Sequence, residues 1–391
     1  MVKIKSILNN NFFGKKCLLR LDLNIPLSNK GKILDDTRII ESIPTIDYLL
    51  GQSAKVIILS HIGRPKGKYN EEYSFKPLLN EIGSKLKQEI CFIEYKNLSK
   101  ISDIIKSKPN GTLFLVDNIR FNEGEEKNDP DFIDFLSSFG DVFVNDGFGT
   151  IHRNHASIIG ITKKLPSFGG ILLEKEILNI TECISVESSN SVAILGGSKI
   201  SDKIPIIENL SNNFENIIIT GGMIRPFLIA NNKLIQQNKN DMREEIFYAE
   251  KILQKHPKIY VPDQLICAEN LNTEPIILHS SQIYDSDQIF DVGPNSLDEI
   301  GKMILKSDKI IWNGPPGVYE NKNFSSGTKK LLDFIITSNS NIKVAGGGST
   351  VASINHFHAL DYFSHISTGG GAFLSLLEGK FLESIEVLKD E

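Results

Sequence analysis

Short apolar runs alternate with longer amphipathic stretches along almost the whole chain. The apolar runs lie at residues 17–21, 55–59, 112–116, 141–144, 192–195, 216–220, 258–261, 309–312 and 342–345. Stretches with helical periodicity lie between them, at residues 37–50, 74–87, 131–139, 202–212, 241–255, 295–306 and 327–338. This alternation predicts an α/β fold in which parallel sheets are covered by helices.

Polar residues and glycines follow the predicted strands closely. They are Asp22, His61, Asn118, Asp146, Gly196, Gly221, Asn313 and Gly346. In open parallel sheets, ligands bind beyond the carboxyl ends of the strands. We therefore expect the ligand sites to be built from these residues and their neighbours.

The chain of 391 residues is longer than a single hydrophobic core usually allows, which predicts two domains. We expect two Rossmann-like lobes, each a parallel sheet covered by helices, joined by a helical hinge. The N-terminal lobe is predicted at residues 1–169, the connecting helix at 170–185 and the C-terminal lobe at 186–379. The alternative is that residues 170–185 form an ordinary surface helix within one large sheet.

Composition excludes several classes of function. A net charge of -5 argues against nucleic acid as a partner, because no basic face dominates. The four cysteines form no CxxC pair, which predicts neither disulfides nor zinc and fits the cytoplasm. No apolar run approaches the roughly 18 residues of a membrane span, and the first residues have no export-signal pattern.

Arginine is rare enough in this chain to be informative. Of 43 lysines and arginines only seven are arginine, and four of these stand in short motif-like contexts: Arg38, Arg64, Arg120 and Arg153. An arginine fork binds phosphate or carboxylate bidentately, whereas pairing with surface carboxylates is the alternative for any one of them. Asp22 and Asn24 in RLDLNIP and His61 in HIGRP are further candidate ligand contacts.

The second half carries glycine clusters where strands run into helices. They are Gly196-Gly197, Gly221-Gly222, Gly346-Gly347-Gly348 and Gly369-Gly370-Gly371. Such glycines let a helix N-terminus approach a phosphate. The segment LGGSKISDK adds Lys199 and Lys203, which we expect one turn apart on a helix; a solvated helix face is the alternative for either lysine. Two kinds of phosphate site in two lobes predict a phosphoryl-transfer enzyme.

Four motifs in the same order identify a resemblance that covers essentially the whole chain. They are VNDGFGTIHRNHAS at 144–157, LGGSKISDKI at 195–204, WNGPPGVYE at 312–320 and HISTGGG at 365–371. Together they resemble the phosphoglycerate kinase family. The resemblance implies phosphoryl transfer between 1,3-bisphosphoglycerate and ADP with Mg²⁺, giving 3-phosphoglycerate and ATP. It also implies a monomer with a glycerate lobe, a nucleotide lobe and hinge closure, in which residues 380–391 return to the N-terminal lobe.

The resemblance assigns roles residue by residue. It implies a glycerate site formed by Asp22, Asn24, Arg38, His61, Arg64, Arg120 and Arg153. It implies nucleotide contacts from Gly196, Gly197, Lys199, Lys203, Asn313, Glu320, Gly346, Gly347, Gly348, Ser349 and Thr350. The groups nearest the transferring phosphoryl are implied to be Arg38, Lys203, Gly348 and Gly371.

Departures from the family pattern concentrate on the nucleotide side. Ser349 stands where the family has a magnesium-binding aspartate, so no metal ligand is assigned. Arg225-Pro226 replaces small or polar residues in the segment 221–237, Pro315-Pro316 replaces a proline-methionine pair, and Ser375 replaces an acidic residue. The alternatives are a paralogue that binds a phosphoglycerate-like metabolite with weak or no transfer, and a kinase of another small carboxylate.

Overall fold

The computed structural model describes residues 3–234 and 242–390 and divides the chain into two compact units. Unit 1 comprises Met1–Leu178 and Phe381–Glu391, and unit 2 comprises Asn179–Lys380. The division falls within a single helix, α6 (Ile171–Ser185). None of the helices in the described part of the chain is both long and apolar enough to cross a membrane.

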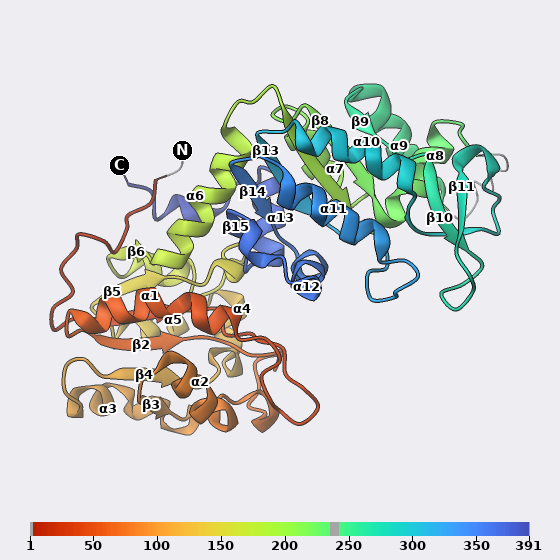
Figure 1. Ribbon diagram of the computed structural model, residues 1–391. Helices are drawn as coiled ribbons and strands as arrows, with labels where there is room; N and C mark the ends of the chain where they lie inside the picture. The colour runs from red at the N-terminus through yellow and green to blue at the C-terminus, as the bar shows by residue number, and fades with distance from the viewer. Residues whose placement is uncertain (1–2, 235–241, 391) are drawn as a thin grey trace. The chain divides into compact units, whose positions relative to one another are not determined.

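Unit 1 contains a six-stranded parallel sheet in the order β3-β4-β2-β1-β5-β6 (Figure 1). Its strands are β1 (Lys16–Arg20), β2 (Lys55–Leu59), β3 (Ile90–Ile93), β4 (Leu113–Val116), β5 (Val142–Asn145) and β6 (Ser167–Gly169). Its helices are α1 (Thr37–Gly51), α2 (Leu79–Leu86), α3 (Ile101–Ser107), α4 (Glu123–Lys127), α5 (Pro130–Ser137) and α14 (Glu383–Glu386).

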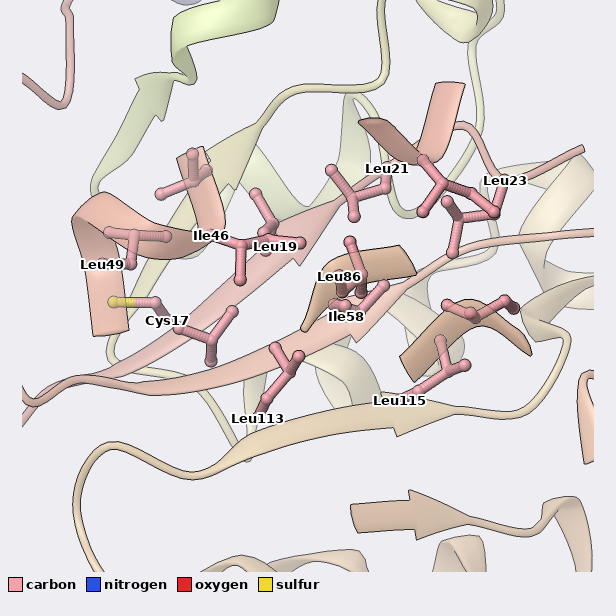
Figure 2. Packing of buried hydrophobic residues seen from close by; sticks show 14 of the residues in the cluster. Cys17, Leu19, Leu21, Leu23, Ile46, Leu49, Ile58, Leu86, Leu113 and Leu115 are labelled. Carbon is pink, nitrogen blue, oxygen red and sulfur yellow. The ribbon is translucent and has the colours of Figure 1, made fainter. Parts of the chain in front are cut away.

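Both faces of this sheet are buried, because successive strand residues point to opposite faces. On β1, Cys17 and Leu19 belong to one apolar cluster, whereas Leu18 belongs to the cluster on the other face. Figure 2 shows Ile46 and Leu49 of α1 packed against the first of these faces. A strand buried on both sides reads as a continuous apolar run, which explains why the runs were visible in the sequence.

The last residues of the chain belong to unit 1. Lys5 N donates to Leu388 O at 2.6 Å, and Ile4 forms an antiparallel bridge with Lys389. Ser384 Oγ, at the start of α14, donates to Ile151 O at 2.6 Å. The two ends of the polypeptide are therefore tied together by hydrogen bonds in the described residues of unit 1.

Unit 2 contains a second six-stranded parallel sheet, in the order β15-β14-β13-β7-β8-β9. Its strands are β7 (Ser191–Gly196), β8 (Asn216–Thr220), β9 (Ile259–Tyr260), β13 (Lys309–Asn313), β14 (Ile342–Ala345) and β15 (His365–Ile366). Its helices are α7 (Ile204–Leu210), α8 (Ile224–Ala230), α9 (Arg243–Lys255), α10 (Pro294–Leu305), α11 (Ser326–Thr337), α12 (Gly348–His356) and α13 (Gly370–Leu377). The two parallel sheets covered by helices confirm the predicted fold class.

Unit 2 also contains a small antiparallel sheet that the sequence pattern did not predict. Its order is β11-β10-β12, with β10 (Gln264–Ala268), β11 (Ile276–His279) and β12 (Gln288–Val292). Strand β11 exposes Ile276 and Ile277, which are adjacent residues, so its apolar pattern matches neither a buried nor a half-buried strand. The short strands β3, β6 and β15 were missed as well.

One predicted helix begins later than expected. The pattern predicted a helix over residues 202–212, and we expected Lys199 and Lys203 one turn apart on a helix, but α7 spans Ile204–Leu210. Both lysines lie on the turns before it, so the prediction that they share a helix face is wrong. Pro205 in the first turn fixes a helical φ without needing a hydrogen bond, and this sets the helix start. Residues 235–237 and 241, which belong to two segments singled out above, lie outside the described residues.

A buried carboxylate joins the small sheet to the start of α11. Asp291 of β12 is fully buried and accepts hydrogen bonds from Gly327 N at 2.7 Å and Val292 N at 2.9 Å. Burial raises the pKa of Asp291 to about 7, against the opposing effect of these hydrogen bonds. A Cβ on Gly327 would lie 2.1 Å from Asp291 Oδ1, so glycine is required for this close approach.

This raised pKa predicts a specific pH dependence of stability. Between about pH 4 and pH 7 the folded protein keeps a proton on Asp291 that the unfolded chain has released, so stability falls as pH rises through that window. Asparagine does not titrate in this range, so the stability of Asp291→Asn should lack this pH-dependent contribution. Urea unfolding of both proteins from pH 4.5 to 8 should show the difference in unfolding free energy, wild type minus variant, decreasing towards pH 7 and then levelling. A difference that is constant across the range would contradict the prediction.

Candidate active site

In unit 1 the residues after β1 contact the start of α1. Arg38 Nη1 lies 2.9 Å from Asp22 Oδ2 and donates to Asn24 O at 2.8 Å. Asn24 Oδ1 in turn accepts a hydrogen bond from Gly63 N at 2.8 Å. Three of the residues predicted for the glycerate site, Asp22, Asn24 and Arg38, therefore form one connected group.

The loop after β2 brings a second arginine into contact with this group. Gly63 has a φ of 63°, and a Cβ there would lie 2.3 Å from the Tyr73 ring, so this position requires glycine. Arg120 is buried, and its Nη1 donates to Gly63 O at 3.3 Å. Its Nε lies 3.3 Å from Glu126 Oε1 as an ion pair without a hydrogen bond, and its Nη2 has no hydrogen-bond partner among the described residues.

The remaining positive groups of unit 1 act on one another electrostatically. Burial lowers the pKa of Arg153, and the positive charges of Arg64 and Arg38 lower it further while Asp22 opposes them. Burial together with the surrounding positive charges holds the pKa of His61 well below its ordinary value. A Cβ on Gly149 would lie 2.1 Å from Asp22 Oδ2 and 3.7 Å from Arg38 Nη2, so glycine leaves the charged groups room. The arrangement is a cluster of cations that a small polyanion would neutralise.

Sequence reasoning missed the polar groups beneath this cluster. Arg20 is fully buried within β1, and Glu125 and Ser157 are fully buried beside it. A signal was present, because an arginine inside the apolar run CLLRL must find partners for its charge in the protein interior. Arg20 is one of the seven arginines, and the motifs of the chain assigned it no role.

Unit 2 contains a pocket of about 520 Å³ at the carboxyl ends of its parallel strands. The lining residues come from the turns after β7, β8, β13 and β14, with contributions from β12 and α13. They include Gly196, Gly197, Lys199, Asp202, Lys203, Gly221, Gly222, Asn313, Gly347, Gly348 and Ser349. Asp202 is a pocket-lining carboxylate that sequence reasoning did not single out.

Lys203 is the buried cation of this pocket. Its Nζ donates to Asn313 Oδ1, and Asn313 Nδ2 donates to Gly346 O at 2.7 Å. Burial lowers the pKa of Lys203, although the charges of Asp202 and Glu378 oppose that effect. Among the described residues the ammonium group is held by a neutral amide and forms no direct ion pair, which leaves its charge available to an anion.

The backbone around the pocket is closely packed. A Cβ on Gly314 would lie 2.5 Å from the backbone of Gly196, and a Cβ on Gly196 would lie 2.8 Å from Gly314 O. Gly314 N donates to Thr350 Oγ1 at 2.7 Å, so Thr350 supports the turn from a buried position. The glycines at this point keep two strand ends in backbone contact.

Two helices begin at the pocket edge. Helix α12 begins at Gly348 after Gly347, whose φ is 98°, and α13 begins at Gly370 after Gly369. A Cβ on Gly370 would lie 4.0 Å from Gly348 N, which places the two helix starts side by side. The first N–H groups of a helix have no partner within it and favour anions. Gly371 lies in the first turn of α13, next to these groups.

Glu320, a predicted nucleotide contact, and three residues that depart from the family pattern can be placed individually. Glu320 is exposed and does not line the pocket; its side chain hydrogen-bonds Tyr319. Arg225 Nη2 donates to Asp287 O, so its guanidinium ties α8 to the loop before β12. Ser375 Oγ donates to Gly371 O at 3.0 Å within α13. Ser349 is exposed at the start of α12 and lines the pocket.

The neighbouring glycines of α12 offer a matched pair of substitutions. A Cβ on Gly347 would lie 2.4 Å from Asn313 Nδ2 on a backbone of positive φ, whereas a Cβ on Gly348 would meet nothing within 4 Å. Gly347→Ala should lower stability by about 1–3 kcal/mol, and Gly348→Ala should change it by less than about 0.5 kcal/mol. The single tryptophan, Trp312, adjoins Asn313, so urea unfolding followed by its fluorescence checks both variants. Equal losses in the two variants would refute the argument.

Comparisons with known proteins cover nearly the whole chain. The model of the phosphoglycerate kinase family matches residues 7–380. The phosphoglycerate kinase of Borreliella afzelii is 41% identical over 386 residues, covering 97% of this chain and 98% of the relative. The solved structure of phosphoglycerate kinase from Coxiella burnetii has a TM-score of 0.87 at 34% identity, and that from Pyrococcus horikoshii has 0.84 at 29%; each comparison covers 98% of both chains. The chain therefore belongs to the phosphoglycerate kinase family, whose members are kinases with a carboxyl group as acceptor.

Proposed function

We propose that this protein catalyses the reversible transfer of a phosphoryl group between 1,3-bisphosphoglycerate and ADP, giving 3-phosphoglycerate and ATP. The observation that carries the proposal is the family match over residues 7–380, a range that includes both candidate sites. The paralogue without transfer and the kinase of another carboxylate were alternatives from sequence, and no comparison favours either one.

We assign the glycerate substrate to the cation cluster of unit 1. Its carboxylate and phosphate need several positive donors, which Arg38, Arg64, Arg120 and Arg153 supply. Asp22 and Asn24 orient Arg38 and offer acceptors to a hydroxyl group. His61 adds a neutral ring, because the surrounding cations suppress its protonation.

We assign the nucleotide to the pocket of unit 2. Lys199 and Lys203 supply positive charge, and the helix starts at Gly348 and Gly370 supply N–H donors to phosphate oxygens. Asn313 positions Lys203, while Thr350 supports the turn that carries Gly314. Glu320 is the weakest of these assignments, because it lies outside the pocket lining and is engaged by Tyr319.

The chemistry needs no nucleophile from the protein. In the direction of ATP use, a carboxylate oxygen of 3-phosphoglycerate attacks the γ-phosphorus while the bond to the ADP oxygen breaks. The main barrier is repulsion between two anions and the cost of aligning them, so cations and N–H groups at fixed positions provide the rate enhancement. We propose Arg38 and Lys203 as the side chains that contact the transferring phosphoryl.

Magnesium fits this pocket as an ion carried by the nucleotide. The described residues contain no group of three or more His, Cys, Asp or Glu side chains that could hold a metal ion. Nucleotide-bound Mg²⁺ needs only one or two carboxylates besides the phosphates, and the pocket offers Asp202 and the hydroxyl of Ser349. Once bound, the ion would neutralise part of the phosphate charge. We further propose, from the family resemblance, that the protein acts as a monomer in the cytoplasm.

A lysine substitution tests whether the two units bind different substrates. Lys203→Met should reduce kcat by at least about 10³, the scale of removing a cation from a phosphoryl-transfer site, while 3-phosphoglycerate affinity changes less than about twofold. A coupled assay with ATP, Mg²⁺ and 3-phosphoglycerate gives kcat, and calorimetric titration gives the affinity. Lys302→Met, on an exposed position of α10, is the control and should change neither. Loss of glycerate affinity in Lys203→Met, or an inactive wild type, would contradict the proposal.

A second substitution tests the replacement of the family aspartate. Ser349→Asp should lower the KM for the magnesium nucleotide by about 10–100-fold, the range known for damaged metal shells, and should lower the Mg²⁺ concentration at half-maximal rate. Asparagine has nearly the same shape as aspartate but carries no charge. Ser349→Asn should therefore leave the KM for the magnesium nucleotide and the Mg²⁺ concentration at half-maximal rate near their wild-type values. If aspartate and asparagine behave alike, position 349 does not handle the metal.

A further inference from the structure

The guanidinium of Arg20 has no access to solvent, and the interior fixes it through four contacts. Its Nε donates to Ser157 Oγ at 2.9 Å, and its Nη1 donates to Leu21 O and, at 3.4 Å, to Leu59 O. Its Nη2 lies 3.2 Å from His61 Nδ1. Because the side chain is fully buried and so engaged, Arg20 cannot contact a ligand itself.

A buried carboxylate compensates the charge of Arg20 through a hydroxyl group. Ser157 Oγ donates to Glu125 Oε1 at 2.7 Å, and Ser157 N donates to Glu125 Oε2 at 3.0 Å. The hydroxyl hydrogen is committed to Glu125, so the oxygen of Ser157 must accept from Arg20. Hydrogen bonds therefore run in one direction, from Arg20 through Ser157 to Glu125, and they hold the guanidinium in one orientation.

This orientation determines which nitrogen of His61 carries a proton. A guanidinium is always protonated and only donates, so Nδ1 of His61 must accept with its lone pair. Burial of the ring opposes a second proton, and the electrostatic effects of Arg20, Arg153, His155 and Arg38 act in the same direction. His61 is thus the neutral imidazole with hydrogen on Nε2.

The proton on Nε2 has no acceptor in unit 1. Nε2 is buried, and no hydrogen-bond partner for it occurs among the described residues. A buried donor without a partner is unfavourable by about 1–3 kcal/mol, and an anionic oxygen that reached it would remove that penalty. The opposite tautomer would turn a lone pair towards such an oxygen and repel it.

We propose that Arg20 is a positioning residue that locks His61 as the Nε2–H tautomer and so presents one N–H donor to an oxygen of the anionic substrate. The role is additional to the contacts assigned above and rests on the proposed glycerate site for the identity of the ligand. Arg20 acts only through His61.

Nitrogen-15 NMR of the ring of His61 tests the tautomer without any ligand. In the wild type between pH 6 and 8, Nδ1 should show the shift of a non-protonated ring nitrogen and Nε2 that of a protonated one. Arg20→Met combined with Glu125→Gln removes the donor without leaving a lone buried charge, and it should give mixed tautomers or an ordinary titration. Arg20→Lys, which retains the charge and a donor, should preserve the wild-type pattern. A proton on Nδ1 in the wild type would overturn the proposal.

Affinity for 3-phosphoglycerate distinguishes positioning from a merely structural role. The Arg20→Met/Glu125→Gln protein should bind it about 10–100-fold more weakly, the factor of one hydrogen bond to a charged group. Adding those two changes to His61→Ala should weaken binding by less than about threefold more, because their effect passes through the ring. If the loss of affinity in Arg20→Met/Glu125→Gln multiplies with the full loss in His61→Ala, the two effects are independent, and the role of Arg20 would be overturned. A wild type that does not bind 3-phosphoglycerate would overturn the proposed substrate, while the NMR result would still decide the tautomer.

Discussion

The organisation of this protein depends on the burial of both faces of its parallel sheets. Side chains within the strands point alternately into two apolar clusters, so the sheet surface has almost no room for polar chemistry. Most of the candidate ligand groups therefore lie at the strand ends or in the turns beyond them, where Asp22 follows β1 and Asn313 ends β13. Each unit obeys this constraint separately, and each gathers its anion-binding groups at the carboxyl edge of its own sheet.

The two units meet the same electrostatic requirement with different chemical means. Unit 1 uses charged forks whose mutual repulsion is relieved by Asp22 and by the buried Glu125. Unit 2 uses backbone N–H groups and a lysine held by a neutral amide, so it accumulates less formal charge. A small, compact polyanion suits the first arrangement, and an extended phosphate chain suits the second.

Sequence patterns predicted the parallel sheets because doubly buried strands read as uninterrupted apolar runs. Arg38 was predicted beside Asp22 and Asn24 only through the family resemblance, since residues 14 positions apart, as Asn24 and Arg38 are, have no local signal of contact. The antiparallel sheet was missed because β11 leaves Ile276 and Ile277 exposed, and propensity cannot tell such a strand from a loop. The start of α7 was predicted too early, because the helical pattern of residues 202–212 also covers the turn before Pro205. Arg20 was overlooked because its partners, Ser157 and Glu125, are brought to it only by the tertiary fold.

The backbone contact between Gly196 and Gly314 has a consequence for how this protein can change over evolutionary time. Each residue occupies the volume that a side chain on the other would need. Alanine at either position would therefore clash while its neighbour stays in place. A compensating substitution at the other glycine is also excluded, because glycine has no side chain that could be shortened. The ends of β7 and β13 must therefore diverge as one joint unit.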